Sequence, residues 1–74
     1  MKLIKAYGIN IKHNDTLGFE RLATFDNYNI ACEVYQMILC SQEAEYATIE
    51  LEEISVLESG DFEYRTITQN IAQA

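Results

Sequence analysis

Apolar and polar residues along the first third of the chain follow a pattern that predicts two β-strands joined by a turn. Residues 3–11 carry β-favouring isoleucines at alternate positions and are predicted to form a strand that is partly buried on both sides. Residues 19–25 are predicted to form the second strand. The intervening residues 13–18 include Asn, Asp and Gly, which favour turns, so we expect a hairpin. Gly8, inside the first strand, indicates a bulge or the close approach of another part of the chain.

A helical pattern begins after the predicted hairpin. Apolar residues recur every four positions from Ile30 onward, with polar residues on the opposite side, which predicts an amphipathic helix over residues 27–42. Asp26 is the predicted N-cap. This choice places Phe25 and Ile30 at the spacing of a hydrophobic staple. A single longer helix that starts at Phe19 is the main alternative for this part of the chain.

The last third of the chain predicts two further strands. Residues 46–58 alternate between apolar and polar positions, but the phase of the alternation changes halfway. Since the side-chain period of a strand is two, we expect a β-bulge or bend near Glu52–Glu53. Residues 58–61 are predicted to form a turn, and residues 62–69 a last strand. The tail, residues 70–74, is expected to fray.

These elements predict an α+β fold with the order β-β-α-β-β. The simplest packing is one antiparallel sheet with the amphipathic helix on one face. We expect a single small domain over residues 1–74, because the chain is shorter than a typical domain. Hydrophobic residues make up 49% of the chain, which is too high a share for intrinsic disorder.

The two cysteines, Cys32 and Cys40, both fall in the predicted helix. Eight helical residues separate their Cα atoms by about 12 Å, whereas a disulfide requires less than about 7 Å. Two unpaired thiols indicate a reducing compartment. Residues 1–13 lack the unbroken apolar run of a signal peptide, and no 18-residue window is apolar and uncharged. We therefore expect a cytoplasmic protein that has no contact with membranes.

The formal net charge of −7 is concentrated in one part of the chain. Residues 1–42 carry four basic and four acidic side chains, whereas residues 43–74 carry eight carboxylates and one basic residue, Arg65. Glu50 and Glu52 alternate with inward-pointing apolar residues, so both are expected on one exposed face, roughly 6–7 Å apart. This spacing is close to that of phosphates along an extended nucleic-acid strand. The alternative is an ordinary solvated face that keeps the protein soluble.

Residue types that carry enzymatic chemistry are sparse. His13 lies two residues before Asp15, but both fall in a predicted turn with no nucleophile placed beside them. Pairing of Cys32 with His13 would require the fold to bring them together. The sequence has no cluster with metal-ligand spacing and no glycine-rich phosphate loop. We therefore expect no enzyme, no cofactor and no metal ion.

The charge distribution favours a protein-binding role. We expect an inhibitor or decoy whose acidic C-terminal half docks on a basic site of a nucleic-acid-handling protein, without binding nucleic acid directly. In size, acidity and lack of catalytic residues, the chain resembles small phage-encoded counter-defence proteins such as anti-CRISPR inhibitors and DNA mimics. This likeness is one of general character and assigns no residue. The residues expected to bind the partner are Glu50, Glu52, Glu53, Glu58, Asp61, Glu63 and Tyr64.

Two further aromatic residues, Phe62 beside Tyr64 and Tyr28 on the helix, are additional interface candidates because tyrosine and phenylalanine are enriched at interfaces. The alternative function is a small homo-oligomeric structural or accessory subunit with no connection to nucleic acid. A chain of this size has a marginal core. Its last strand offers an edge that a second copy can pair with across a two-fold axis, which would form a homodimer.

Overall fold

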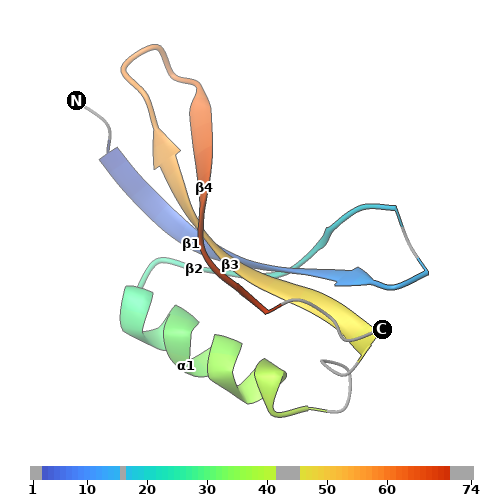
Figure 1. Cartoon of the computed structure of the whole chain (residues 1–74). Helices are drawn as coiled ribbons and strands as arrows, with labels where there is room; N and C mark the ends of the chain where they lie inside the picture. The colour runs from blue at the N-terminus through green and yellow to red at the C-terminus, as the bar shows by residue number, and fades with distance from the viewer. Residues whose placement is uncertain (1–2, 16, 42–45, 71–74) are drawn as a thin grey trace.

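The fold is a four-stranded antiparallel sheet with one helix against one of its faces (Figure 1). The computed structural model describes residues 3–15, 17–41 and 46–70. The strand order is β2-β1-β3-β4, so β1 and β3 are central and β2 and β4 form the edges. The predicted α+β class and the order β-β-α-β-β are confirmed. The elements are β1 (Leu3–His13), β2 (Glu20–Phe25), α1 (Tyr28–Leu39), β3 (Ala47–Val56) and β4 (Phe62–Asn70).

The face of the sheet that α1 covers contains the apolar core. Ile9 and Ile11 of β1 lie directly opposite Leu51 and Ile49 of β3, so the four side chains project toward the helix together. Burial of each such side chain contributes on the order of 1.5–3 kcal/mol. The buried apolar residues of this covered face are Ile9, Ile11, Ala31, Tyr35, Ala47, Ile49 and Leu51. We call the opposite side, which no helix covers, the open face (Figure 1).

The N-cap of α1 is Asn27, so the prediction of Asp26 was wrong. Asn27 has extended backbone angles, and its side-chain oxygen accepts a hydrogen bond of 3.0 Å from the backbone N–H of Ile30. This bond satisfies one of the donors that a helix leaves unpaired in its first turn. The shift by one residue also removes the predicted staple between Phe25 and Ile30, and Ile30 is exposed.

The helix ends at Leu39, earlier than the predicted residue 42, which lies outside the described residues. Cys40 is the C-cap, and its backbone N–H still points to the carbonyl of Gln36. Ser41 then donates both its backbone N–H (3.0 Å) and its hydroxyl (2.6 Å) to the carbonyl of Ile38. A serine side chain that bonds to the backbone in this way competes with helix continuation. No helix in the described part of the chain has the length and hydropathy that a membrane span requires.

The register of the sheet is irregular where the phase change predicted it, but the extra residue lies in a different strand. Leu51 is opposite Thr68 and Glu52 is opposite Thr66, so the additional residue is Ile67 of β4. The prediction of a bulge within β3 at Glu52–Glu53 was therefore wrong as to the strand. The side chains of β3 alternate between the two faces without interruption. The apolar residues therefore lie on the covered face in its first half (Ile49, Leu51) and on the open face in its second half (Ile54).

The turn between β3 and β4 begins at residue 57, one residue before the predicted start at residue 58, because β3 ends at Val56. The backbone N–H of Leu57 donates to the carbonyl of Asp61 (2.8 Å), and that of Gly60 donates to the carbonyl of Leu57 (2.9 Å). Gly60 has φ of 92°, a conformation that side-chain-bearing residues rarely adopt. At the other end of the hairpin, Asn70 still pairs with Ile49, so fraying does not begin at residue 70. The rest of the predicted tail, 71–74, lies outside the described residues.

Candidate protein-binding surface

Glu52 does not form the exposed acidic ladder that its position in β3 suggested. It lies on the open face, but only 7% of it is exposed, and its carboxylate forms a salt bridge with Arg21 of β2. The Arg21 guanidinium also donates to the Thr24 hydroxyl, at 3.2 Å. It reaches Glu52 by crossing Gly8 of β1, where an added Cβ would stand 2.2 Å from Arg21 Nη1. The close approach predicted at Gly8 is therefore that of a side chain from the neighbouring strand.

Glu50 is also engaged within the sheet. Asn10 of β1, itself buried, donates from Nδ2 to Glu50 Oε1 at 2.8 Å, and Thr66 of β4 donates to Oε2 at 3.5 Å. Glu50 thus accepts hydrogen bonds from both strands next to β3, whereas Glu52 accepts from β2, which lies on the far side of β1. Such bonds offset the cost of removing a charge from water. Glu50 and Glu52 consequently connect the strands of the open face, and a solvated row of phosphate-like charges does not form there.

Glu53 lies on the other side of the sheet from Glu50 and Glu52. It is opposite Tyr7, whose ring meets the ring of Tyr28 at the start of α1 with centroids 5.3 Å apart. Its carboxylate, 10% exposed, accepts a hydrogen bond of 3.0 Å from Arg65 Nη2. The hydrogen bond and charge of Glu53 raise the pKa of Arg65. The sheet therefore separates three carboxylates that the sequence placed in one binding surface.

The remaining predicted residues gather at the turn end of the β3–β4 hairpin. Glu58 and Asp61 are exposed in the turn, where Ser59 Oγ donates to Asp61 Oδ2 at 3.0 Å. Tyr64 is 58% exposed and follows two residues after Phe62, which is 56% exposed. Figure 1 shows this turn projecting from the end of the sheet farthest from α1. We call this set, Glu58, Asp61, Phe62, Glu63 and Tyr64, the hairpin end.

The two aromatic side chains of the hairpin end share the open face. Phe62 is opposite Val56 and Tyr64 is opposite Ile54, so the predicted alignment of Phe62 with Tyr64 is confirmed. Ile54 is buried beneath them. The hairpin end therefore combines an acidic turn, which complements a basic surface in charge, with an exposed aromatic pair of the kind that is enriched at protein interfaces.

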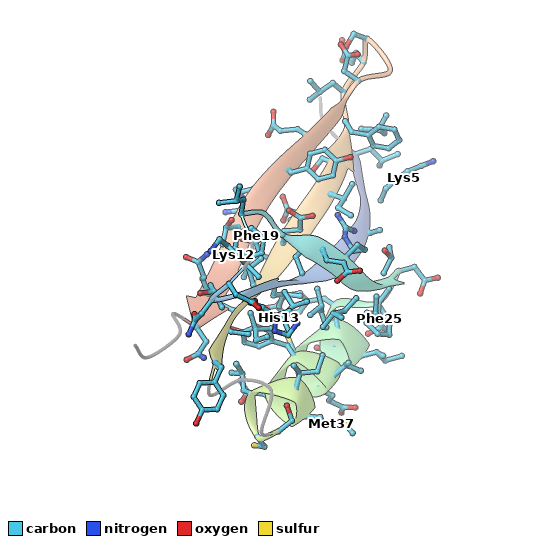
Figure 2. All side chains as sticks on the ribbon, turned by 90° about the vertical axis from the view of Figure 1, so that its right-hand side faces the viewer. Lys5, Lys12, His13, Phe19, Phe25 and Met37 are labelled. Atoms are coloured by element: carbon cyan, nitrogen blue, oxygen red, sulfur yellow. The ribbon has the colours of Figure 1, made fainter. Side chains whose placement is uncertain are left out.

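The two lysines of β1 do not form a basic cluster. Lys5 and Lys12 lie toward the two ends of this strand and project in different directions (Figure 2). In the ranges that the structure describes, no group of three or more His, Cys, Asp or Glu residues could hold a metal ion.

The two cysteines of the helix region are both free thiols, with Cys32 half-buried and Cys40 exposed. A hydrogen bond with Cys32 raises the pKa of Tyr28, the third interface candidate, which is 46% exposed.

No protein-family model, no curated protein and no solved structure matches this chain. The fold and the hairpin end are therefore the basis for the functional argument.

Proposed function

We propose that this chain is a non-enzymatic inhibitor or decoy that docks the hairpin end on a basic site of a nucleic-acid-handling protein. The observation that carries the proposal is the juxtaposition of the turn carboxylates Glu58 and Asp61 with exposed Phe62 and Tyr64, on a turn that stands clear of the helix. Nucleic-acid-handling proteins present clustered Lys and Arg to bind phosphates. A projecting acidic turn is complementary to such a site in charge.

The two kinds of side chain have different roles in this proposal. Complementary charge accelerates association and sets orientation, whereas aromatic side chains buried against the partner supply most of the binding energy. The single basic residue of the C-terminal part of the chain, Arg65, is held by Glu53. Glu58 and Asp61 are exposed in the turn, so their charges lie where a basic partner can approach them.

The engagement of Glu50 and Glu52 within the sheet narrows the proposed surface. Their carboxylates are hydrogen-bonded to β1, β2 and β4, so the exposed charge of the proposed surface comes from Glu58 and Asp61, with half-buried Glu63 beside them. We place the activity in the cytoplasm, because Cys32 and Cys40 are free and the reducing cytoplasm keeps thiols in that state.

A pair of charge-matched variants tests the proposal. Glu58→Gln with Asp61→Asn removes two charges from the turn, while Glu20→Gln with Glu33→Gln removes two from exposed positions of β2 and α1. Each double variant changes the net charge from −7 to −5. Circular dichroism should show the same fold for both, since all four positions are exposed.

The wild type and both variants are then tagged and passed through a lysate of the cell in which the chain acts, with bound proteins identified by mass spectrometry. We expect the wild type and the β2/α1 variant to retain a nucleic-acid-binding protein that the turn variant loses. Wild-type chain should displace a labelled nucleic acid from that protein in fluorescence anisotropy. Most of the affinity should be lost above about 0.3 M salt, because screening weakens the charge attraction. Equal retention by all three chains would contradict a role for the turn.

A further inference from the structure

The distribution of apolar side chains indicates that the isolated chain leaves much hydrophobic surface uncovered. Among the residues that the structure describes, eight apolar ones are buried, while ten large ones are exposed. Chains of this size commonly gain stability from self-association, because their own core is small. Two of these exposed apolar residues, Phe62 and Tyr64, lie at the hairpin end and belong to β4.

The outer edge of β4 is open to pairing over a short straight stretch. The strand order places β4 at the edge of the sheet, and α1 packs mainly under β1, β2 and β3 (Figure 1). The helix meets β4 at Thr68, through Tyr35, beyond the straight stretch. Residues 62–66 pair with β3 in uninterrupted register, from the turn to the extra residue Ile67. Proteins usually protect such an edge with proline, lysine or a bulge. Residues 62–66 contain no proline and no lysine, and the bulge lies beyond them.

We infer that β4 pairs with β4 of a second copy of this chain, antiparallel, about a two-fold axis at Tyr64. Tyr64 is the centre of the straight stretch. An axis through it places Glu63 opposite Arg65 of the partner subunit, and Arg65 opposite the partner's Glu63. Opposite charges that face each other across strands stabilise their pairing. Arg65, with 62% of its side chain exposed, has donors beyond the one that binds Glu53.

Other two-fold registers of this stretch lack this complementarity. An axis at Glu63 places Asp61 opposite the partner's Arg65 but opposes Glu63 to the partner's Glu63, and an axis at Arg65 opposes two arginines. An axis at Phe62 places Glu63 opposite Asp61 of the partner subunit. Like charges directly opposite each other destabilise a strand pair. The order of charges along β4, acidic then basic on either side of Tyr64, therefore gives opposite-charge pairs without any like-charge pair only about Tyr64.

The pairing would create a continuous eight-stranded sheet from two four-stranded ones. Phe62 and Tyr64 of both copies would form one aromatic surface on the shared open face, joined to Ile54 beneath them. This inference shares Glu63 and Tyr64 with the hairpin end but does not depend on the proposed function, because it is tested on the purified chain alone. The turn variant Glu58→Gln with Asp61→Asn should dimerise like the wild type.

Reversal of single charges tests the register. The wild type should sediment at about 17 kDa, twice the 8.5 kDa of one chain. Glu63→Arg opposes two arginines at each pair and Arg65→Glu opposes two glutamates, so each variant alone should sediment as a monomer. A mixture of the two variants restores an opposite charge at both pairs and should sediment as a heterodimer. A monomeric wild type, or a mixture that remains monomeric although both variants fold by circular dichroism, would overturn the inference.

Cysteine cross-linking tests the axis without altering charge, and it remains informative if Arg65→Glu fails to fold beside Glu53. In a Cys32→Ala, Cys40→Ser background, Tyr64→Cys places two thiols across the axis, where opposed Cβ atoms lie about 4.5–5.5 Å apart. Phe62→Cys is the matched control, since the two side chains are almost equally exposed. Its thiols would lie about 13 Å apart along the strands. Under mild oxidation Tyr64→Cys should form a covalent dimer and Phe62→Cys should not, whereas equal cross-linking or none would refute the axis.

Discussion

The two faces of β3 are shielded from water by different interactions, the covered face fully and the open face in part. On the covered face, Ile49 and Leu51 pack among the side chains of β1 and α1 and make no polar contacts. On the open face, hydrogen bonds hold Glu50 to β1 and β4, and a salt bridge holds Glu52 to β2. Successive residues of one strand thus show that a polar face can be removed from water without a covering layer.

The difference has an energetic consequence. Apolar burial is non-directional and contributes in proportion to the area removed from water. A buried carboxylate stabilises the fold only while its partners remain in place, and loss of one partner leaves a desolvated charge. The covered face should therefore respond to changes of volume, and the open face to the loss of a specific partner.

The largest expected effect is on the covered face. Leu51→Ala removes a fully buried side chain opposite Ile9 and beneath α1. We expect the free energy of unfolding to fall by about 2–5 kcal/mol, because the lost burial and the resulting cavity act together. Urea unfolding followed by circular dichroism measures this change. A loss below about 1 kcal/mol would mean that the core collapses around the truncation.

The next largest effect is on the open face. Arg21→Met keeps much of the side-chain length but leaves the Glu52 carboxylate without its ion-pair partner. We expect a loss of about 1–3 kcal/mol, because the carboxylate is buried while Arg21 is partly exposed. Adding Glu52→Gln should recover part of the loss, since the buried charge is then removed. A double-mutant cycle in urea tests this coupling, and strictly additive losses would contradict it.

A smaller effect distinguishes two candidate caps of the helix that covers the core. Asn27→Ala removes the side-chain oxygen that accepts the N–H of Ile30 and should cost about 1 kcal/mol. Asp26→Ala, at the neighbouring exposed position, should change stability by less than about 0.5 kcal/mol. Thermal unfolding of the two variants side by side measures the difference. The reverse order of effects would favour the cap expected from sequence.

The smallest effect concerns Tyr35, where the helix meets β4. Burial raises the pKa of Tyr35 above 10.0, and a hydrogen bond with Thr68 partly opposes the shift. The folded state therefore holds the phenolic proton more tightly than the unfolded state. This contribution to stability is complete below pH 10 and is lost as the pH rises through the pKa of the folded state. Tyr35→Phe should weaken the alkaline decline in urea unfolding measured between pH 9 and pH 11, and an unchanged decline would assign it to other tyrosines.

Sequence reasoning recovered the elements more completely than the candidate site. The four strands and the helix are local features, and their alternation or four-residue spacing is visible without contacts. The turn carboxylates Glu58 and Asp61 were also expected at the surface, as they are in the structure. The pairing of Glu52 with Arg21 was missed because 31 residues separate the two. Gly8 was the available signal, since it marked the place where another group approaches β1.

The order of elements, the apolar face of β3 and the acidity of the C-terminal part all follow from the chain's own pattern, because backbone periodicity and turn chemistry act over a few residues. Which carboxylates remain solvated depends instead on strand order and register. Strand pairing places Arg21 across Gly8 from Glu52, and Arg65 opposite Glu53, so those acids are neutralised while Glu58 and Asp61 stay exposed in the turn. Burial and ion pairing are properties of neighbours in space, and in this protein the neighbours come from different strands.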